Sequence, residues 1–138
     1  MSRSQLKSGN AKVARGKELE FLAASHEDPL SPGAFKKVLF DAKLLPSGKV
    51  QMLNWAKVPA GRAFQNHFHE DMHEVFVITS GKAEMKIGID SYILESGDAV
   101  IVPPLAEHSM LALDGKDVHY LVFGVSAESG GKTIILPT

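Results

Sequence analysis

The 138-residue sequence contains no cysteine. A disulfide framework and thiolate metal ligation are therefore both excluded, and any metal ion must be held by nitrogen and oxygen atoms. The sequence also lacks a charge excess, because 15 lysines and arginines face 16 aspartates and glutamates. Such a balance creates no long-range field, so we expect neither nucleic acid nor a membrane surface as a partner. The partner that we expect is a small molecule.

Long apolar runs are missing as well. The longest apolar segment covers residues 99–106 and is interrupted by Pro103 and Pro104, so it is too short to span a bilayer. The first residues lack the apolar centre of a secretory signal. We therefore expect a soluble, cytoplasmic protein, and the length fits one domain that is large enough to bury a core.

Short β segments follow one another along most of the chain. Runs rich in β-branched and aromatic residues alternate with turn signals such as Ser80-Gly81 and Asp114-Gly115. Only residues 16–25 contain enough good helix formers to suggest a helix. The pattern predicts an all-β barrel or sandwich with strands over residues 36–40, 50–58, 63–68, 75–79, 82–87, 91–94, 99–102, 108–113, 119–125 and 133–136.

Four candidate metal ligands lie within eight residues: His67, His69, His73 and Glu74. Side chains alternate along a strand, so His67 and His69 point the same way with Cα atoms about 6.6 Å apart. Both rings can then reach one ion at bonds of roughly 2.1 Å. Gln65 shares this face by the same alternation, which makes it a candidate for hydrogen bonds to a bound molecule.

The next ligand is ambiguous on strand periodicity alone. On an unbroken strand His73 would face the same side as His69, whereas Glu74 would face away. The polar segment Glu70-Asp71-Met72 can form a bend that resets the register, and this favours Glu74. In that case His73 becomes a residue beside the ligands or in the pocket, and a catalytic candidate together with Gln65.

The spacing of these residues resembles the cupin superfamily. Its first motif, G-x5-H-x-H-x3-4-E-x6-G, is matched at every fixed position, and its second, G-x5-P-x-G-x2-H-x3-N, is matched in part. Leu105 stands where the family usually has glycine, and Ala112 where it often has asparagine. A bulky residue disfavours a positive φ, so we expect the turn before His108 to avoid one. The matching residues are Gly61, His67, His69, Glu74 and Gly81 in the first motif and Gly97, Pro103 and His108 in the second.

This resemblance implies a cupin-type double-stranded β-helix, a jelly-roll-like barrel of two antiparallel sheets with a short N-terminal arm or helix. We expect a single domain over residues 1–138, with an extension over residues 1–35 and a barrel core over about 50–125. The resemblance also implies one divalent transition metal held by His67, His69, Glu74 and His108. Four protein ligands leave exchangeable positions on Fe, Mn or Ni, which we favour over Zn or Cu.

The implied function is that of a metal-dependent small-molecule enzyme. Its chemistry would be that of a Lewis-acid isomerase or lyase, or that of a non-heme metal dioxygenase. The alternative is a non-catalytic, metal-containing module that binds a small molecule or sugar. The feature that separates them is an acid–base group in the cavity beyond the ligands, for which His73, Tyr92, Tyr120 and Glu107 are the candidates. We expect His26, in the polar stretch 25–28, on the surface.

Resemblance to small cupins also predicts a homodimer, because exposed sheet edges require cover. Analytical ultracentrifugation at micromolar concentrations should then give about twice the chain mass of 14.9 kDa. A single species at the chain mass would contradict this expectation.

Overall fold

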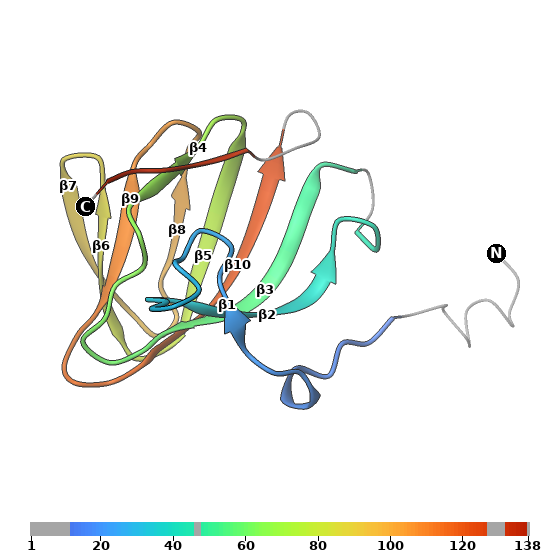
Figure 1. Ribbon diagram of the computed structural model, residues 1–138, viewed down its shortest axis with the longest axis horizontal. Helices are drawn as coiled ribbons and strands as arrows, with labels where there is room; N and C mark the ends of the chain where they lie inside the picture. Colours follow the sequence, from blue (N-terminus) through green and yellow to red (C-terminus); the bar gives the residue numbers. More distant parts are fainter. Residues whose placement is uncertain (1–11, 46–47, 127–131, 138) are drawn as a thin grey trace, which may run out of the picture.

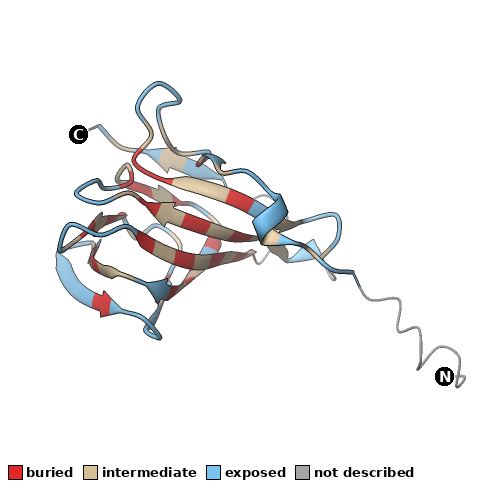
Figure 2. Ribbon diagram, turned by 90° about the horizontal axis from the view of Figure 1, so that it is seen from below, coloured by how far each residue is buried: buried red, intermediate tan, exposed pale blue. Residues whose placement is uncertain are grey.

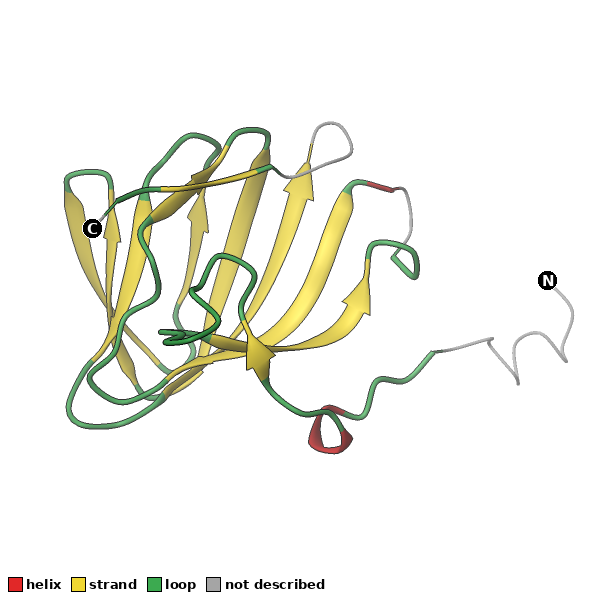
Figure 3. Cartoon of the chain, in the orientation of Figure 1, coloured by secondary structure: helices red, strands yellow, loops and turns green. Residues whose placement is uncertain are grey.

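The computed structural model describes residues 12–45, 48–126 and 132–137, in which strands and loops make up nearly all of the chain (Figure 3). The all-β expectation is confirmed. No helix in these ranges is long and apolar enough to cross a membrane. The elements are the 3₁₀ turn η1 (Gly16–Glu18) and the strands β1 (Leu22–Ala23), β2 (Phe35–Asp41), β3 (Val50–Val58), β4 (His67–His69), β5 (Met72–Ser80), β6 (Lys82–Ile87), β7 (Asp90–Glu95), β8 (Ala99–Val102), β9 (His108–Ala112), β10 (Val118–Ser126) and β11 (Thr133–Ile135).

Two antiparallel sheets face each other (Figure 1). One has the order β1-β2-β3-β10-β5-β8, and the other has the order β11-β4-β9-β6-β7. From β3 to β6 the chain passes to the other sheet with each successive strand, and it does so again from β8 to β11. This winding is the expected double-stranded arrangement, and it leaves a space between the sheets in which inward side chains meet.

The core follows from strict alternation along the strands. Strand β10 alternates buried and half-buried residues over its whole length, so every second side chain points between the sheets. Figure 2 shows the same alternation along neighbouring strands. Ile78, Met85 and Met110 are buried completely, and each such side chain stabilises the fold by roughly 1.5–3 kcal/mol relative to an exposed one.

Strands β3, β6 and β8 begin and end where the sequence predicts. The helix expected over residues 16–25 is wrong, because only the turn Gly16–Glu18 is helical and Leu22 pairs with Lys36 as part of a strand. Pairing with β2 outweighs the helix propensity of so short a segment. The strand expected over residues 63–68 begins only at His67, although Ala63 makes an isolated bridge to Leu111.

Gly81 sits in the tight turn that joins β5 to β6. Its φ is 86°, and a Cβ there would lie 2.3 Å from the backbone oxygen of Asp117. Both the conformation and the space require glycine at this position. The geometry of this turn therefore accounts for Gly81, the last glycine of the first cupin-like motif.

Leu105 contradicts the expectation that this turn avoids positive φ, because its φ is 70°. The side chain is 66% exposed, so burial of the leucine contributes little to offset the cost of the conformation. The backbone holds the turn instead, since the Leu105 N–H donates to the carbonyl of His69 at 2.7 Å. The turn therefore keeps the left-handed conformation without the glycine that would adopt it freely.

We predict that Leu105→Gly stabilises the protein. A left-handed conformation costs a leucine about 1–2 kcal/mol, and glycine avoids this cost. Glycine also gives the unfolded chain more conformational freedom, which reduces the stabilisation by about 0.5–1 kcal/mol. Urea denaturation should show a free energy of unfolding higher by about 0.5–1 kcal/mol. Leu105→Ala is the matched control and should show no gain, because alanine keeps the β-carbon.

Candidate metal centre

Four buried side chains converge between the two sheets. His67 and His69 come from β4, and His108 comes from the neighbouring strand β9, where it pairs directly with His67. Glu74 reaches toward them from β5 in the opposite sheet. One ligand atom from each residue lies within 4.8 Å of all the others. The sequence-predicted ligand residues are thus brought together in one cluster.

A bend at residues 70–71 decides which side of β5 faces the cluster. Because the bend separates β4 from β5, the alternation restarts at Met72, with Met72 and Glu74 buried and His73 exposed. Glu74 therefore points inward although it lies five residues after His69. His73 points outward from the barrel and does not line the cavity beside the cluster.

Hydrogen bonds fix the orientation of the imidazole rings. His67 Nδ1 lies 2.6 Å from the carbonyl oxygen of Gln65, and His108 Nδ1 lies 2.9 Å from that of Ala106. A carbonyl only accepts, so both Nδ1 atoms must carry the proton and donate it. The Nε2 atoms of His67 and His108 then face the centre, and each presents a lone pair when its ring is neutral. His69 Nδ1 contacts the hydroxyl of Thr133 at 2.9 Å.

The electrostatics of the cluster suit ligation. Burial, followed by the charges of His26 and His108, lowers the pKa of His67 to about 3, so its imidazole is neutral at physiological pH. Burial alone would raise the pKa of Glu74, but contacts with His108 and His69 outweigh it and hold that pKa well below its usual range. A neutral imidazole and an ionised carboxylate are the protonation states that bind a metal.

The distances agree with a common central ion. Ligand atoms at about 2.1 Å from one ion lie roughly 3 Å apart when they are adjacent around it. Glu74 Oε1 is 2.7 Å from His69 Nε2, 3.0 Å from His108 Nε2 and 4.0 Å from His67 Nε2. These four residues therefore fit a divalent ion that takes nitrogen and oxygen ligands. The ligand atoms would need to move by about 1 Å or less to reach it.

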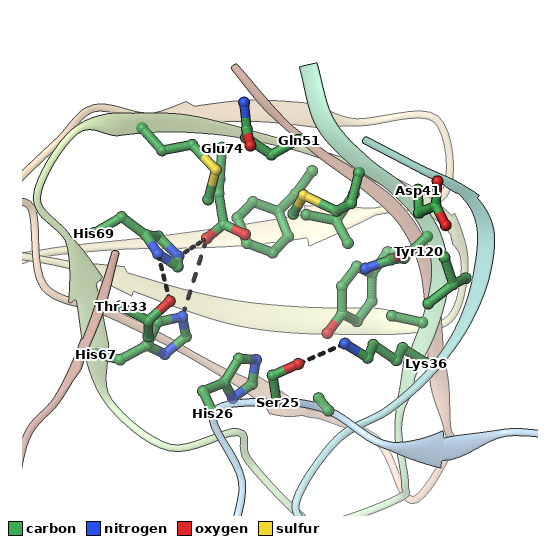
Figure 4. Close-up of a pocket in the computed structure, with 18 residues that line it drawn as sticks. Ser25, His26, Lys36, Asp41, Gln51, His67, His69, Glu74, Tyr120 and Thr133 are labelled. Carbon is green, nitrogen blue, oxygen red and sulfur yellow. Dashed lines mark hydrogen bonds and ion pairs between the residues drawn. The ribbon is translucent and has the colours of Figure 1, made fainter. Parts of the chain in front are cut away.

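A cavity of about 340 Å³ adjoins the cluster. His67, His69 and Glu74 lie on its wall, and Tyr120 also lines it (Figure 4). Tyr120 is buried, and burial together with the charges of Glu74 and Glu27 raises the pKa of its hydroxyl well above the usual value. Of the four acid–base candidates, His73 and Glu107 are exposed, Tyr92 is 45% exposed on β7, and only Tyr120 lines this cavity.

His26 lines the cavity, which corrects the expectation that it lies on the surface. Its ring stacks on that of His67, with centroids 4.2 Å apart and an angle of 17° between the planes. Its Nδ1 lies 2.6 Å from a carboxylate oxygen of Glu27. The polar sequence around His26 gave no signal for this, because the position depends on the way the N-terminal segment folds back across the barrel.

Gln65 lies outside the cavity beside the cluster. Its side-chain amide donates to the carbonyl of Leu136 at 2.9 Å, and its backbone N–H donates to Glu27 at 2.7 Å. Strand β4 begins only at His67, so the alternation that placed Gln65 on the histidine face does not reach it. Gln65 instead joins the C-terminal segment and the segment around Glu27 to the barrel.

Comparison with known proteins agrees with this geometry. The family model described as the cupin domain matches residues 54–124. Quercetin 2,3-dioxygenase from Bacillus subtilis (strain 168) is 35% identical over 71 residues, which are 51% of this chain but only 18% of that protein. The chain thus spans less than a fifth of that relative's length.

Two solved structures show the same fold at low sequence identity. A predicted oxalate decarboxylase from Thermotoga maritima has a TM-score of 0.74 at 19% identity, over 83% of this chain and 99% of that one. A cupin-2 domain from Rhodospirillum rubrum has a TM-score of 0.69 at 22% identity, over 92% and 80% of the two chains.

We predict that Glu27→Gln destabilises the protein in a pH-dependent way. Glu27 accepts hydrogen bonds from His26 and from the backbone N–H groups of Gly33 and Gln65. Burial alone would raise its pKa, but these contacts, with that of His26 the largest, lower the pKa below the ordinary 4.5. Its stabilising contribution is therefore present above pH 4.5 and is lost as the pH falls through the depressed folded-state pKa.

Urea denaturation of the wild type and Glu27→Gln at several pH values measures this contribution. The free energy of unfolding should differ by about 1–3 kcal/mol near pH 7, and the difference should shrink as the pH falls below 4.5. A difference that stays constant down to pH 3 would show that the charge of Glu27 has no part in it.

Proposed function

The chain belongs to the cupin family, and we propose that it is a metal-dependent enzyme acting on a small organic molecule inside its barrel. The ion would be held by His67, His69, Glu74 and His108. The proposal covers two kinds of chemistry, that of a Lewis-acid isomerase or lyase and that of a metal dioxygenase. A module that binds a small molecule without turnover is the competing possibility.

One observation carries the proposal. The carbonyl contacts of Gln65 and Ala106 turn the Nε2 atoms of His67 and His108 toward the carboxylate of Glu74. A carboxylate among imidazole nitrogens in a buried space requires a cation beside it, which is either a proton on Nε2 or a metal ion. A divalent ion satisfies all four side chains at once, and it leaves their outer hydrogen bonds intact.

The cavity beside the cluster supports a small-molecule substrate. Its volume of about 340 Å³ lies within the range of ligand pockets. Phe76, Val122 and Met52 give it apolar walls that exclude water from a bound molecule. A bound divalent ion would supply a Lewis acid, or a place for dioxygen beside the substrate.

The residues of this chain have separate parts in such a reaction. Thr133 orients His69 through the contact to its Nδ1. Tyr120 keeps its proton at physiological pH because the pKa of its buried hydroxyl is raised, so it is suited to donate a hydrogen bond to a substrate oxygen. The curated relative is named as a dioxygenase, which supports the oxidative form of the proposal.

We predict that the purified protein binds about one divalent ion per chain and that His69→Ala loses it. His73→Ala is the matched control, since it removes a histidine from the exposed side of β5 and should retain the ion. Elemental analysis after incubation with Fe, Mn, Ni, Zn or Cu measures this. Equal metal content in the two variants, or none in the wild type, would refute the proposed site.

Removal of the ion separates a catalytic from a structural role. A chain that buries a full hydrophobic core does not need a metal to fold, so chelated protein should keep its circular dichroism spectrum and unfold cooperatively at a lower temperature. Oxygen consumption by the reloaded protein with candidate substrates then distinguishes dioxygenase from isomerase or lyase chemistry. Tight binding of small molecules without any turnover would favour the binding module.

A further inference from the structure

The end of the cavity away from the histidines carries a lysine. In Figure 4, His67 and His69 lie on one side of the cavity, and Lys36, Asp41 and Tyr120 lie on the other. Lys36 and Lys37 are neighbours on β2, but they face opposite sides. Lys37 packs over the rings of Phe21 and Trp55, whereas Lys36 lines the cavity.

The register of the sheet explains why Lys36 points inward. Lys36 pairs with Ala56, which in turn pairs with Tyr120, so the three form one row across β2, β3 and β10. All three line the cavity. The next row on the same face contains Asn54, which pairs with Val122. Strand pairing therefore directs the side chain of Lys36 toward the cavity.

Lys36 has no carboxylate partner among the described residues, where no ion pair is formed by its Nζ. In the described part of the chain, its Nζ donates a hydrogen bond of 2.5 Å to the hydroxyl of Ser25. An ammonium group has three N–H donors, so two remain for a ligand. Burial lowers the pKa of this half-buried group, which is the expected effect of removing a cation from water without a counter-charge.

Asn54 gives a second, independent indication. Its side chain is 6% exposed, it lines the same cavity, and its Oδ1 has no hydrogen-bond partner in the described part of the chain. A buried amide oxygen without a partner is costly. A carboxylate only accepts hydrogen bonds, so the amide can bind one only through its NH₂ group. Rotation of the amide by 180° exchanges oxygen and nitrogen, and the orientation with the NH₂ group toward the ligand supplies this donor.

We propose that Lys36 and Asn54 bind a carboxylate group of the substrate, so that the substrate is a small organic acid whose other oxygen atoms face the histidine cluster. The second half of this statement rests on the proposed metal-dependent function. A carboxylate matches the single positive charge of Lys36. A phosphate dianion does not, because among the described residues the other charged group at this end of the cavity is the carboxylate of Asp41.

The size of the substrate follows from the strand positions. Asn54 on β3 and Glu74 on β5 are separated by β10. Glu74 lies in the row of Met52, two residues along β3 from Asn54, so their backbones lie roughly 12 Å apart. Both side chains extend into the cavity and shorten the gap. A chain of a few carbon atoms between two polar ends spans it.

Calorimetric titration with paired acids tests this subsite. The diacids 2-oxoglutarate and 2-oxoadipate carry a second carboxylate, whereas 2-oxopentanoate and 2-oxohexanoate have the same chain lengths without it. The wild type should bind each diacid about tenfold more tightly than its partner, which is the effect of one charge-assisted hydrogen bond. Lys36→Met should abolish this difference. Lys43→Met should keep it, because it removes the same charge from an exposed turn residue that does not line the cavity.

Asn54→Leu separates a binding role from a structural one. Leucine has a similar size and removes the unpartnered oxygen, so the melting temperature should stay the same or rise. The affinity for the diacids should nevertheless fall severalfold. A lower melting temperature with unchanged affinity would assign Asn54 a purely structural role and remove it from the subsite.

Each titration is made with Mn²⁺-loaded and with metal-free protein, so that the two proposals fail separately. Preference for diacids that depends on Lys36 in either form supports the carboxylate subsite, even if no metal binds and the proposed function fails. Equal affinity for diacids and monoacids, persistence of the preference in Lys36→Met, or no binding of any acid to either form overturns the subsite. The metal content of the same samples reports independently on the histidine cluster.

Discussion

The structure depends on the meeting of three imidazoles and one carboxylate in a buried space between the two sheets. Carbonyl oxygens behind His67 and His108 hold the Nδ1 protons of both rings, and this turns their Nε2 atoms toward Glu74. A buried carboxylate in this position requires a cation beside it, either a proton on the rings or a metal ion. The opposed sheets bring the groups together, since the histidines belong to one sheet and the glutamate to the other. The two sheets thus gather four side chains that a cation can join.

Much of this could be predicted from the sequence, because the decisive signals are local. Two histidines separated by one residue share a strand face, and the polar Glu70-Asp71 segment bends so that Glu74 points inward. Alternation and turn residues also located strands such as β3 and β6. The position of His26 could not be predicted in this way. Its stacking on His67 joins residues 41 positions apart and depends on the path of the N-terminal segment.

Leu105 shows how a local rule is overridden beside the site. Sequence reasoning excluded a positive φ for a bulky residue, yet the turn adopts one. The Leu105 N–H donates to the carbonyl of His69, and three residues later the chain supplies His108. One strained turn therefore contacts the backbone of one candidate ligand and leads directly into another. Departures from local preference are expected at functional sites, where the surrounding structure fixes the backbone.

The walls of the cavity come from residues inside and outside the family match. The histidines and Glu74 lie within the family match over residues 54–124, whereas His26 and Lys36 lie before it and Thr133 lies after it. The part shared with the family therefore supplies the candidate metal centre, and the segments outside the match complete the walls that contact a substrate. This division explains why a motif of five positions indicates the metal chemistry but carries no information on the substrate. Substrate recognition in this protein must be derived from residues beyond the five motif positions, among them Lys36 on β2 and His26, which stacks on His67, because these residues line the same cavity.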